Sequence, residues 1–249
     1  MEKAENLRKT LIERYNNNLL FGVEKPGHLY IENFTFEVIK GSHPYQVHKD
    51  GYMISIVSFR HDKSFDYAKL KLYGIDIVSI SAFAQSKLAF IDLGDVFSIE
   101  GHTFFDCEDL KIVKGPNLRY IGKGSFEDCY DLEVVKFPKV LYGAPEIFYC
   151  CYSLSNISLP KLREVPSHMF KDSKVANMET ALFDLSGTHR LCIEAFDSCT
   201  LGTVNLSALK FADYDAFNKC KVKECIINDE IYSFLLSKDS HFPITNITV

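Results

Sequence analysis

A phenylalanine recurs along the chain at intervals of 21 or 22 residues, with one longer interval of 26 residues. The members of this column are Phe83, Phe104, Phe126, Phe148, Phe170, Phe196 and Phe217. A fixed period of about twenty to fifty residues is the signature of repeat architectures, in which each unit stacks on its neighbours. The pattern therefore predicts a solenoid of about seven units.

Two further columns accompany the phenylalanines. A small residue follows each Phe after three positions, and an aliphatic residue comes two or three positions later. The small residues are Ser86, Cys107, Cys129, Cys151, Ser173, Cys199 and Cys220. The aliphatic residues are Leu88, Leu110, Leu132, Leu154, Val175, Leu201 and Val222. A unit this short cannot enclose a core alone, so we expect all three columns to face inwards and stack between neighbours.

A second apolar position, three residues after the aliphatic one, predicts a short strand in every unit. Its members are Ile91, Val113, Val135, Ile157, Met178, Val204 and Cys225. Pro138 and Pro160 follow two of these segments, where a residue without an N–H suits the end of a strand. We therefore expect a predominantly β solenoid with short helices.

These repeats resemble a known family. The segments Leu154–Pro160 and Ile193–Cys199 are similar to the two halves of the leucine-rich repeats of the BspA-like (Treponema pallidum type) family. The resemblance covers about two thirds of the chain. The sequence departs from the family pattern at Ser86, at Ser173 and in the 26-residue unit. The resemblance implies a leucine-rich-repeat solenoid and, for some relatives, a role as a surface adhesin.

The chain before the repeats is predicted to cap the first end of the solenoid. Residues Glu2–Leu20 fit a helix with a narrow apolar face, and docking of that face to a partner is the alternative. Alternating apolar residues between His28 and Phe59 predict a β hairpin or small sheet, with Lys40–Gly51 as its turn. A first, degenerate unit is expected at Asp66–Leu72.

The last residues are predicted to form a second cap. We expect a short helix at Glu230–Leu236 and a final strand at Ile244–Val249. The predicted organisation is thus an N-terminal capping region (residues 1–64), the solenoid (residues 65–228) and a C-terminal cap (residues 229–249).

The unit with the longer interval contains an insertion, which we place at Thr180–His189. Extra residues in a solenoid map to loops on one face, often the binding face. The segment Ala181–Gly187 is therefore either a protruding contact loop or an insertion that the fold simply tolerates.

Composition narrows the class of protein. The chain has 249 residues, 47% of them hydrophobic, which is ample for a core, and its apolar runs are much shorter than a membrane span. Met1–Arg14 is charged throughout, without the apolar core of a signal peptide, so we expect a cytoplasmic location. The net charge of −5 argues against nucleic acid as a partner.

The sequence offers no candidate for catalysis. Five of the eight cysteines belong to the repeat column, and Cys150, Cys192 and Cys225 lack C-x-x-C or His pairing at zinc spacing. The eight histidines are scattered, without an adjoining nucleophile or carboxylate cluster. We expect reduced thiols, no metal, no cofactor and no enzymatic activity.

Two outward columns are the candidate binding surfaces. The first is expected to contain Phe90, Ile112, Val134, Asn156, Asn177 and Thr203, with Lys111, Lys114 and Lys136 beside its apolar end. The second contains Ser98, Tyr120, Tyr142, Glu164, Arg190 and Phe211. Exposed apolar stripes and tyrosines are typical of contact sites, although a capping segment could cover either column.

The sequence therefore predicts a noncatalytic module that binds a protein partner. An intracellular scaffold or inhibitor is the first interpretation, and a surface adhesin is the alternative. An enzyme with its site in residues 1–64 is a third, weaker interpretation. Homo-oligomerisation is compatible with every one of them.

Overall fold

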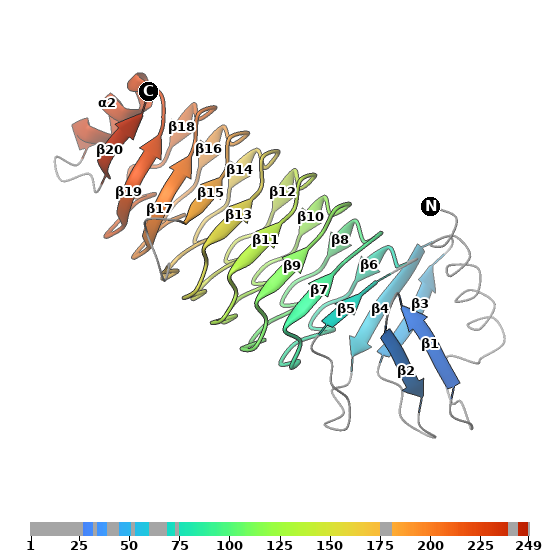
Figure 1. The fold of residues 1–249 in the computed structure, drawn as a ribbon. Coiled ribbons are helices and arrows are strands. Elements are labelled where there is room, and N and C mark those ends of the chain that lie inside the picture. The colour runs from blue at the N-terminus through green and yellow to red at the C-terminus, as the bar shows by residue number, and fades with distance from the viewer. Residues whose placement is uncertain are drawn as a thin grey trace.

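A computed structural model describes residues 27–31, 34–38, 45–50, 53–59, 69–72, 75–174, 181–238 and 244–248. These residues form an elongated solenoid that runs from two N-terminal hairpins to a C-terminal helix and strand (Figure 1). The predicted N-terminal helix at Glu2–Leu20 and the predicted domain boundary near residue 64 lie outside the described residues.

One side of the solenoid is a nine-stranded parallel sheet, to which each unit contributes one strand (Figure 1). Its strands, in spatial order, are β5 (Lys69–Lys71), β7 (Phe90–Asp92), β9 (Ile112–Lys114), β11 (Val134–Lys136), β13 (Asn156–Ser158), β15 (Leu182–Asp184), β17 (Thr200–Asn205), β19 (Lys221–Ile226) and β20 (Ile244–Thr248). The predicted degenerate unit near Leu72 is confirmed by β5, which pairs in parallel with β7.

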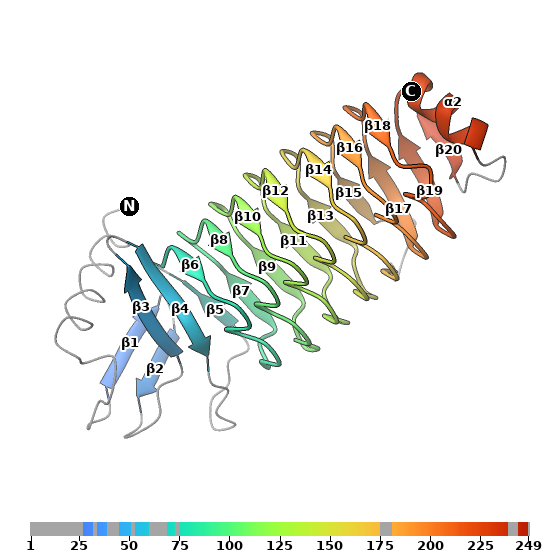
Figure 2. The ribbon, with the colours of Figure 1, turned by 180° about the vertical axis from the view of Figure 1, so that it is seen from behind.

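A second side carries two-residue strands from the other half of each unit (Figure 2). A six-stranded sheet contains β12 (Tyr142–Gly143), β10 (Tyr120–Ile121), β8 (Ser98–Ile99), β6 (Ile77–Val78), β4 (Met53–Phe59) and β3 (Tyr45–Asp50). A three-stranded sheet continues with β14 (Glu164–Val165), β16 (Arg190–Leu191) and β18 (Phe211–Ala212).

Stacked turns around the repeat phenylalanines make the third side. Each turn takes positive φ angles two residues before and two residues after its Phe in most units, as at His102 and Asp106 around Phe104. The turns pair through backbone hydrogen bonds, and the N–H of Phe104 donates to the carbonyl of Ser125 at 2.8 Å. Hydrogen bonding therefore runs from unit to unit on all three sides.

The predicted core columns are confirmed. The seven phenylalanine rings stack along the solenoid, with successive centroids 5.1–5.4 Å apart and ring planes within 12° of parallel. The stack continues at 5.2 Å across the 26-residue interval, from Phe170 to Phe196. The Cys and Leu columns are buried beside it wherever the structure describes them.

The position of the insertion was predicted wrongly. Phe183, not Met178, pairs with Ile157 and Val204 and is fully buried, so Phe183 holds the inward position of this unit. The segment Ala181–Gly187 is consequently strand β15 and its turn, not a protruding loop. Residues 175–180, where the extra residues fall, lie outside the described residues.

The chain before the repeats forms two hairpins, which are β1 (Gly27–Ile31) with β2 (Phe34–Val38) and β3 with β4. The predicted turn at Lys40–Gly51 is wrong for Tyr45–Asp50, which is strand β3. Gly41 and Pro44 favour a turn, but the alternation that begins with Tyr45 and Val47 forms a strand. Strand β4 also pairs in parallel with β6, so the second hairpin extends a solenoid sheet.

The C-terminal elements fall close to their predicted positions. Helix α2 spans Asp229–Lys238 and begins with two acidic residues, Asp229 and Glu230, which favour the N-terminus of a helix. Strand β20 spans Ile244–Thr248 and pairs in parallel with β19. The final strand therefore continues the nine-stranded sheet.

Candidate protein-binding surfaces

The first predicted column lies on the outward face of the nine-stranded sheet. Parallel pairing places Phe90 beside Ile112, Ile112 beside Val134, and Val134 beside Asn156. The next member is Leu182, not the expected Asn177, because β15 begins later than predicted. Thr203 follows Leu182 as expected.

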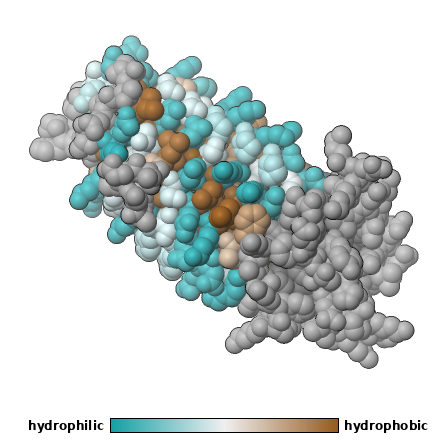
Figure 3. Space-filling model, viewed as in Figure 1, coloured by the Kyte–Doolittle hydropathy of each residue, from teal (hydrophilic) through white to brown (hydrophobic). Residues whose placement is uncertain are grey.

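The apolar end of this column is half-buried. Phe90, Ile112 and Val134 cover part of one another, and an apolar band crosses this face of the molecule (Figure 3). The ammonium group of Lys114 lies 5.4 Å above the centre of the Phe90 ring, a cation–π contact. Lys136 is exposed and has no ion-pair partner among the described residues. The stripe therefore combines apolar area with positive charge.

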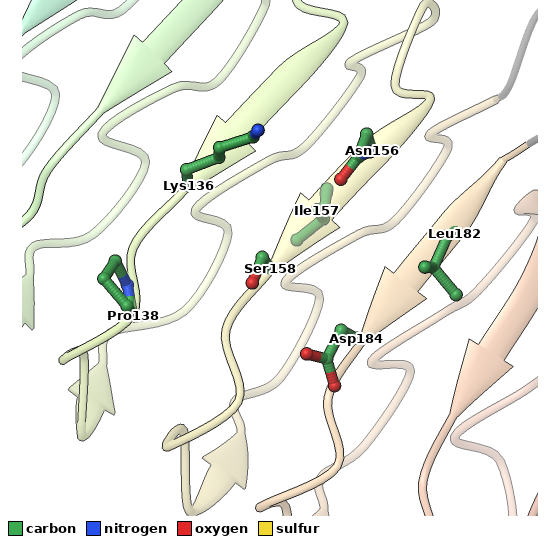
Figure 4. A pocket seen from close by; sticks show the side chains of 7 residues that line it. All are labelled: Lys136, Pro138, Asn156, Ile157, Ser158, Leu182 and Asp184. Carbon is green, nitrogen blue, oxygen red and sulfur yellow. The ribbon is translucent and has the colours of Figure 1, made fainter.

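A shallow depression adjoins this stripe (Figure 4). Its volume is about 350 Å³, and it spans β11, β13 and β15. The residues that line it are Lys136, Pro138, Asn156, Ile157, Ser158, Leu182 and Asp184. Leu182 is 43% exposed and supplies an apolar contact that the sequence analysis missed. The depression has a lysine at one end and an aspartate at the other, without a cluster of groups suited to catalysis.

The second predicted column lies on the second side of the solenoid, along the six-stranded and three-stranded sheets. Tyr120 pairs with Ser98 on one side and Tyr142 on the other. The two tyrosine side chains are 44% and 55% exposed. Tyrosine is common at protein interfaces because its ring offers apolar area and its hydroxyl a polar tip. The structure therefore brings Tyr120 and Tyr142 together, on a different side from Phe90 and Val134.

The far end of the second column is internally paired. The Nε of Arg190 lies 3.8 Å from a carboxylate oxygen of Glu164, and its guanidinium lies 5.0 Å above the ring of Phe211. The charge of Arg190 is therefore already paired with neighbouring residues of the same column. The tyrosine end, by contrast, leaves its aromatic rings open.

A stacked pair of tyrosines on the turn side was not expected. The rings of Tyr130 and Tyr152 lie 5.3 Å apart and nearly parallel, and Lys174 lies 5.7 Å above Tyr152. Both tyrosines directly follow a repeat cysteine, Cys129 and Cys151. Because both tyrosines hold the same position in their repeat units, the sequence alone could have predicted that they stack.

Five of the buried thiols are poor nucleophiles. Burial raises the pKa of Cys107 to about 11 and that of Cys225 to about 12, and it raises the pKa of Cys129, Cys151 and Cys199 as well. A reactive cysteine needs the opposite shift, towards the thiolate at neutral pH. All eight cysteines are free.

The described residues were also compared with the requirements of a metal site and of a membrane span, and they meet neither. The described part of the chain holds no group of His, Cys, Asp and Glu side chains suited to a metal ion. It also has no helix with the length and apolar character needed to cross a membrane.

Comparison with known proteins identifies the repeats. The model of the BspA type leucine-rich repeat region matches six copies, over residues 76–182 and 183–247. A search of curated proteins finds no match.

Two solved structures share the fold. A leucine-rich cell surface protein from Faecalibacterium prausnitzii gives a TM-score of 0.58 at 16% identity, over 83% of this chain and 56% of that one. A leucine-rich-repeat protein from Bacteroides ovatus gives 0.53 at 14% identity, over 82% of this chain and 74% of that one. This chain thus corresponds to only part of the Faecalibacterium protein. Since the family model covers well over half of its residues, the protein belongs to the BspA type leucine-rich repeat family, whose repeats generally bind proteins.

Proposed function

We propose that this protein is a noncatalytic module that binds another protein through the outward face of its nine-stranded sheet, between β7 and β15. The observation that carries the proposal is the apolar stripe of Phe90, Ile112 and Val134, which continues towards the depression at Leu182. Contiguous apolar area on a surface is typical of protein interfaces.

The charges beside the stripe support the same function. Lys114 and Lys136 stand in one column along its edge, and the structure gives neither of them a carboxylate partner among the described residues. A rim of charge around an apolar centre is the usual anatomy of an interface. The partner is therefore expected to offer an apolar side chain with acidic residues around it.

The size of the strip limits how the partner binds. Neighbouring strands lie about 4.8 Å apart, so the five strands from β7 to β15 span roughly 19 Å, and their exposed residues add about 10–13 Å of width. The resulting area of roughly 190–250 Å² is far below the roughly 800 Å² that each partner typically buries. The adjoining loops or a capping segment must contribute the remainder.

The setting of this interaction has two candidates. Free thiols that donate hydrogen bonds inside the core suit a reducing compartment, which favours an intracellular scaffold or inhibitor. The Faecalibacterium protein that shares this fold is a cell surface protein, which favours an adhesin instead. Fractionation of the native cells, with protease accessibility of the chain in intact cells, separates these two settings.

The binding surface is tested by capture of the partner from the native host, followed by affinity measurements with purified components. The variant Phe90→Glu with Val134→Glu places two charges in the stripe and should weaken binding by about tenfold or more. A control with the same change in net charge is Ile80→Glu with Ile193→Glu, at exposed positions on the turn side. Unchanged affinity in the stripe variant would reject this surface, and turnover of a small molecule by the purified chain would reject the noncatalytic function.

A further inference from the structure

A column with four basic residues runs along the second side of the solenoid, one position before each short strand from β8 to β18. Its members are Phe97, Arg119, Leu141, Arg163, His189 and Lys210, and the acidic Asp76 holds the same position before β6. From Arg119 onwards, each backbone N–H donates to the carbonyl of the preceding member, at distances of 2.9, 3.1, 3.3, 2.8 and 3.0 Å along the column. These hydrogen bonds fix the spacing of the side chains, even between β12 and β14, where one sheet ends and the next begins.

The basic side chains of this column have no carboxylate partner within the described parts of the chain. Arg119, Arg163, His189 and Lys210 are all exposed, and none forms an ion pair with a described residue. Arg190 in the neighbouring column differs, because Glu164 and Phe211 already engage it. The basic column is therefore open to a ligand that brings negative charge.

Aromatic side chains flank this open charge. Tyr120 directly follows Arg119, Tyr142 directly follows Leu141, and both rings are about half exposed. Phe97, at the start of the column, is exposed as well. Grooves lined with aromatic rings bind proline-containing segments in the polyproline II conformation. This surface can therefore bind a ligand in two ways: its arginines can bind carboxylates, and its aromatic rings can pack against an extended segment.

The spacing of the two arginines selects among acidic ligands. Arg119 and Arg163 are two units apart, which corresponds to roughly 10 Å at about 4.8 Å per unit. A polyproline II segment has three residues per turn and rises about 3.1 Å per residue, so side chains three residues apart share one face at roughly 9 Å. Acidic residues at every third position therefore match the arginines.

We propose that this column, centred on Arg119, Tyr120, Tyr142 and Arg163, binds an extended acidic segment of another protein, with carboxylates at every third residue. Arginine forms paired hydrogen bonds with a carboxylate, which gives the contact both strength and orientation. A protein segment is favoured over nucleic acid because nucleic-acid affinity rests on many cations that neutralise phosphates, whereas this column offers two arginines and Glu164 stands next to one of them. This surface lies on a different side from the apolar stripe, so either proposal can fail without the other.

The test uses the full chain and a fluorescein-labelled peptide of repeated Glu-Pro-Pro, with fluorescence anisotropy as the readout. The variant Arg119→Glu with Arg163→Glu should raise the Kd by about tenfold or more, since two charge-assisted contacts are lost. Lys219→Glu with Lys221→Glu makes the same change in net charge at two exposed positions away from this column, one in a turn and one at the start of β19. This control should bind like the parent, and matching thermal melts should show that both variants are folded.

Two further ligands and the comparison of the variants decide the proposal. A repeated Lys-Pro-Pro peptide should not bind, and equal binding of the two peptides would overturn the assignment of charge. Equal weakening by both double variants would show a general charge effect and overturn the column as the site. Absence of Glu-Pro-Pro binding, or tighter binding of an oligothymidylate that is lost in the arginine variant, would also overturn the proposal.

Discussion

The thiol of Cys151 donates a hydrogen bond to the backbone carbonyl of Phe126, one unit earlier, at 3.1 Å. Cys129 makes the same contact to Phe104 at 3.1 Å, and Cys199 makes it to Phe170 at 2.6 Å. Where serine replaces cysteine, the hydroxyl of Ser173 reaches the carbonyl of Phe148 at 2.5 Å. The column therefore needs a small side chain with a donor, which explains why it contains Cys or Ser.

This relationship predicts different outcomes for two substitutions at one position. Cys151→Ser should keep the hydrogen bond and change the free energy of unfolding by less than about 1 kcal/mol. Cys151→Ala removes the donor and should cost about 1–2 kcal/mol, because a buried hydrogen bond and some packing are lost. Urea denaturation followed by circular dichroism measures both values.

Cys192→Ala is the control for this pair, since Cys192 is half-buried and stands outside the repeat column. Its unfolding free energy should stay close to that of the parent. Equal stability of Cys151→Ala and Cys151→Ser would show that the donor contributes nothing.

The phenylalanine stack predicts the largest effect of a single substitution. The Phe126 ring lies between Phe104 and Phe148, at centroid distances of 5.2 and 5.4 Å, and is fully buried. Phe126→Ala should cost about 3–5 kcal/mol, a large part of the 5–15 kcal/mol that stabilises a typical domain. Thermal melting should therefore fall by many degrees.

A matched control for this substitution is Phe211→Ala. Phe211 is 46% exposed and contacts Arg190 on the surface, so its loss should lower the melting temperature only slightly. Melting of Phe126→Ala within a degree or two of the parent would contradict the role of the stack.

The repeat period made the core predictable from sequence. Phe83 to Phe217 share one inward position in every unit, and a column of this kind fixes the register without any knowledge of the backbone. Met178 was assigned wrongly because the period shows that extra residues exist but not where they lie within the unit. Only the pairing of Phe183 with Ile157 locates them before β15.

The binding surfaces were predictable only in part. Tyr120 and Tyr142 were found because their register follows that of the phenylalanines. The basic column obeys the same register, since Arg119 and Arg163 each precede a repeat Phe by seven residues, so its signal is present in the sequence. Exposure and the absence of ion pairs with described residues could not be read from sequence, because they depend on the side chains of adjacent units.

The half-buried thiols predict how alkylation depends on pH. Burial, with the nearby Glu164, raises the pKa of Cys192 to about 11, and burial raises that of Cys150. A thiol reacts as the thiolate, so both should react slowly with iodoacetamide at pH 7 and faster as the pH rises towards 10. Mass spectrometry of the modified peptides gives the two rates.

Glutathione serves as the control for this experiment, because its unperturbed thiol should approach its full rate at lower pH. The fully buried Cys129 and Cys151 should stay unmodified until the protein unfolds. Rates at Cys192 that level off near pH 8 would show that its pKa is not raised.

An ion-pair network on the turn side predicts that the free energy of unfolding falls at low pH. The ammonium of Lys171 lies 2.6 Å from a carboxylate oxygen of Glu194 and 3.0 Å from one of Asp197, and His168 lies 3.2 Å from the same oxygen of Glu194. The hydrogen bond from Lys171 lowers the pKa of Glu194. A carboxyl group with a lowered folded-state pKa stabilises the protein above its unfolded-state pKa, and this contribution is lost as the pH falls through the folded-state value.

Lys171→Met should therefore raise the pKa of Glu194 towards that of an ordinary glutamate, and a carboxyl titration followed by NMR measures the shift. The variant should also lose less stability than the parent when the pH falls from about 5 to 3, because the stabilisation from this pair is already absent. Lys111→Met is the matched control, since Lys111 and Asp131 lie 3.8 Å apart with both side chains more than half exposed. An unshifted Glu194 titration in Lys171→Met would show that Lys171 does not set this pKa, and the same loss of acid sensitivity in Lys111→Met would assign the effect to net charge.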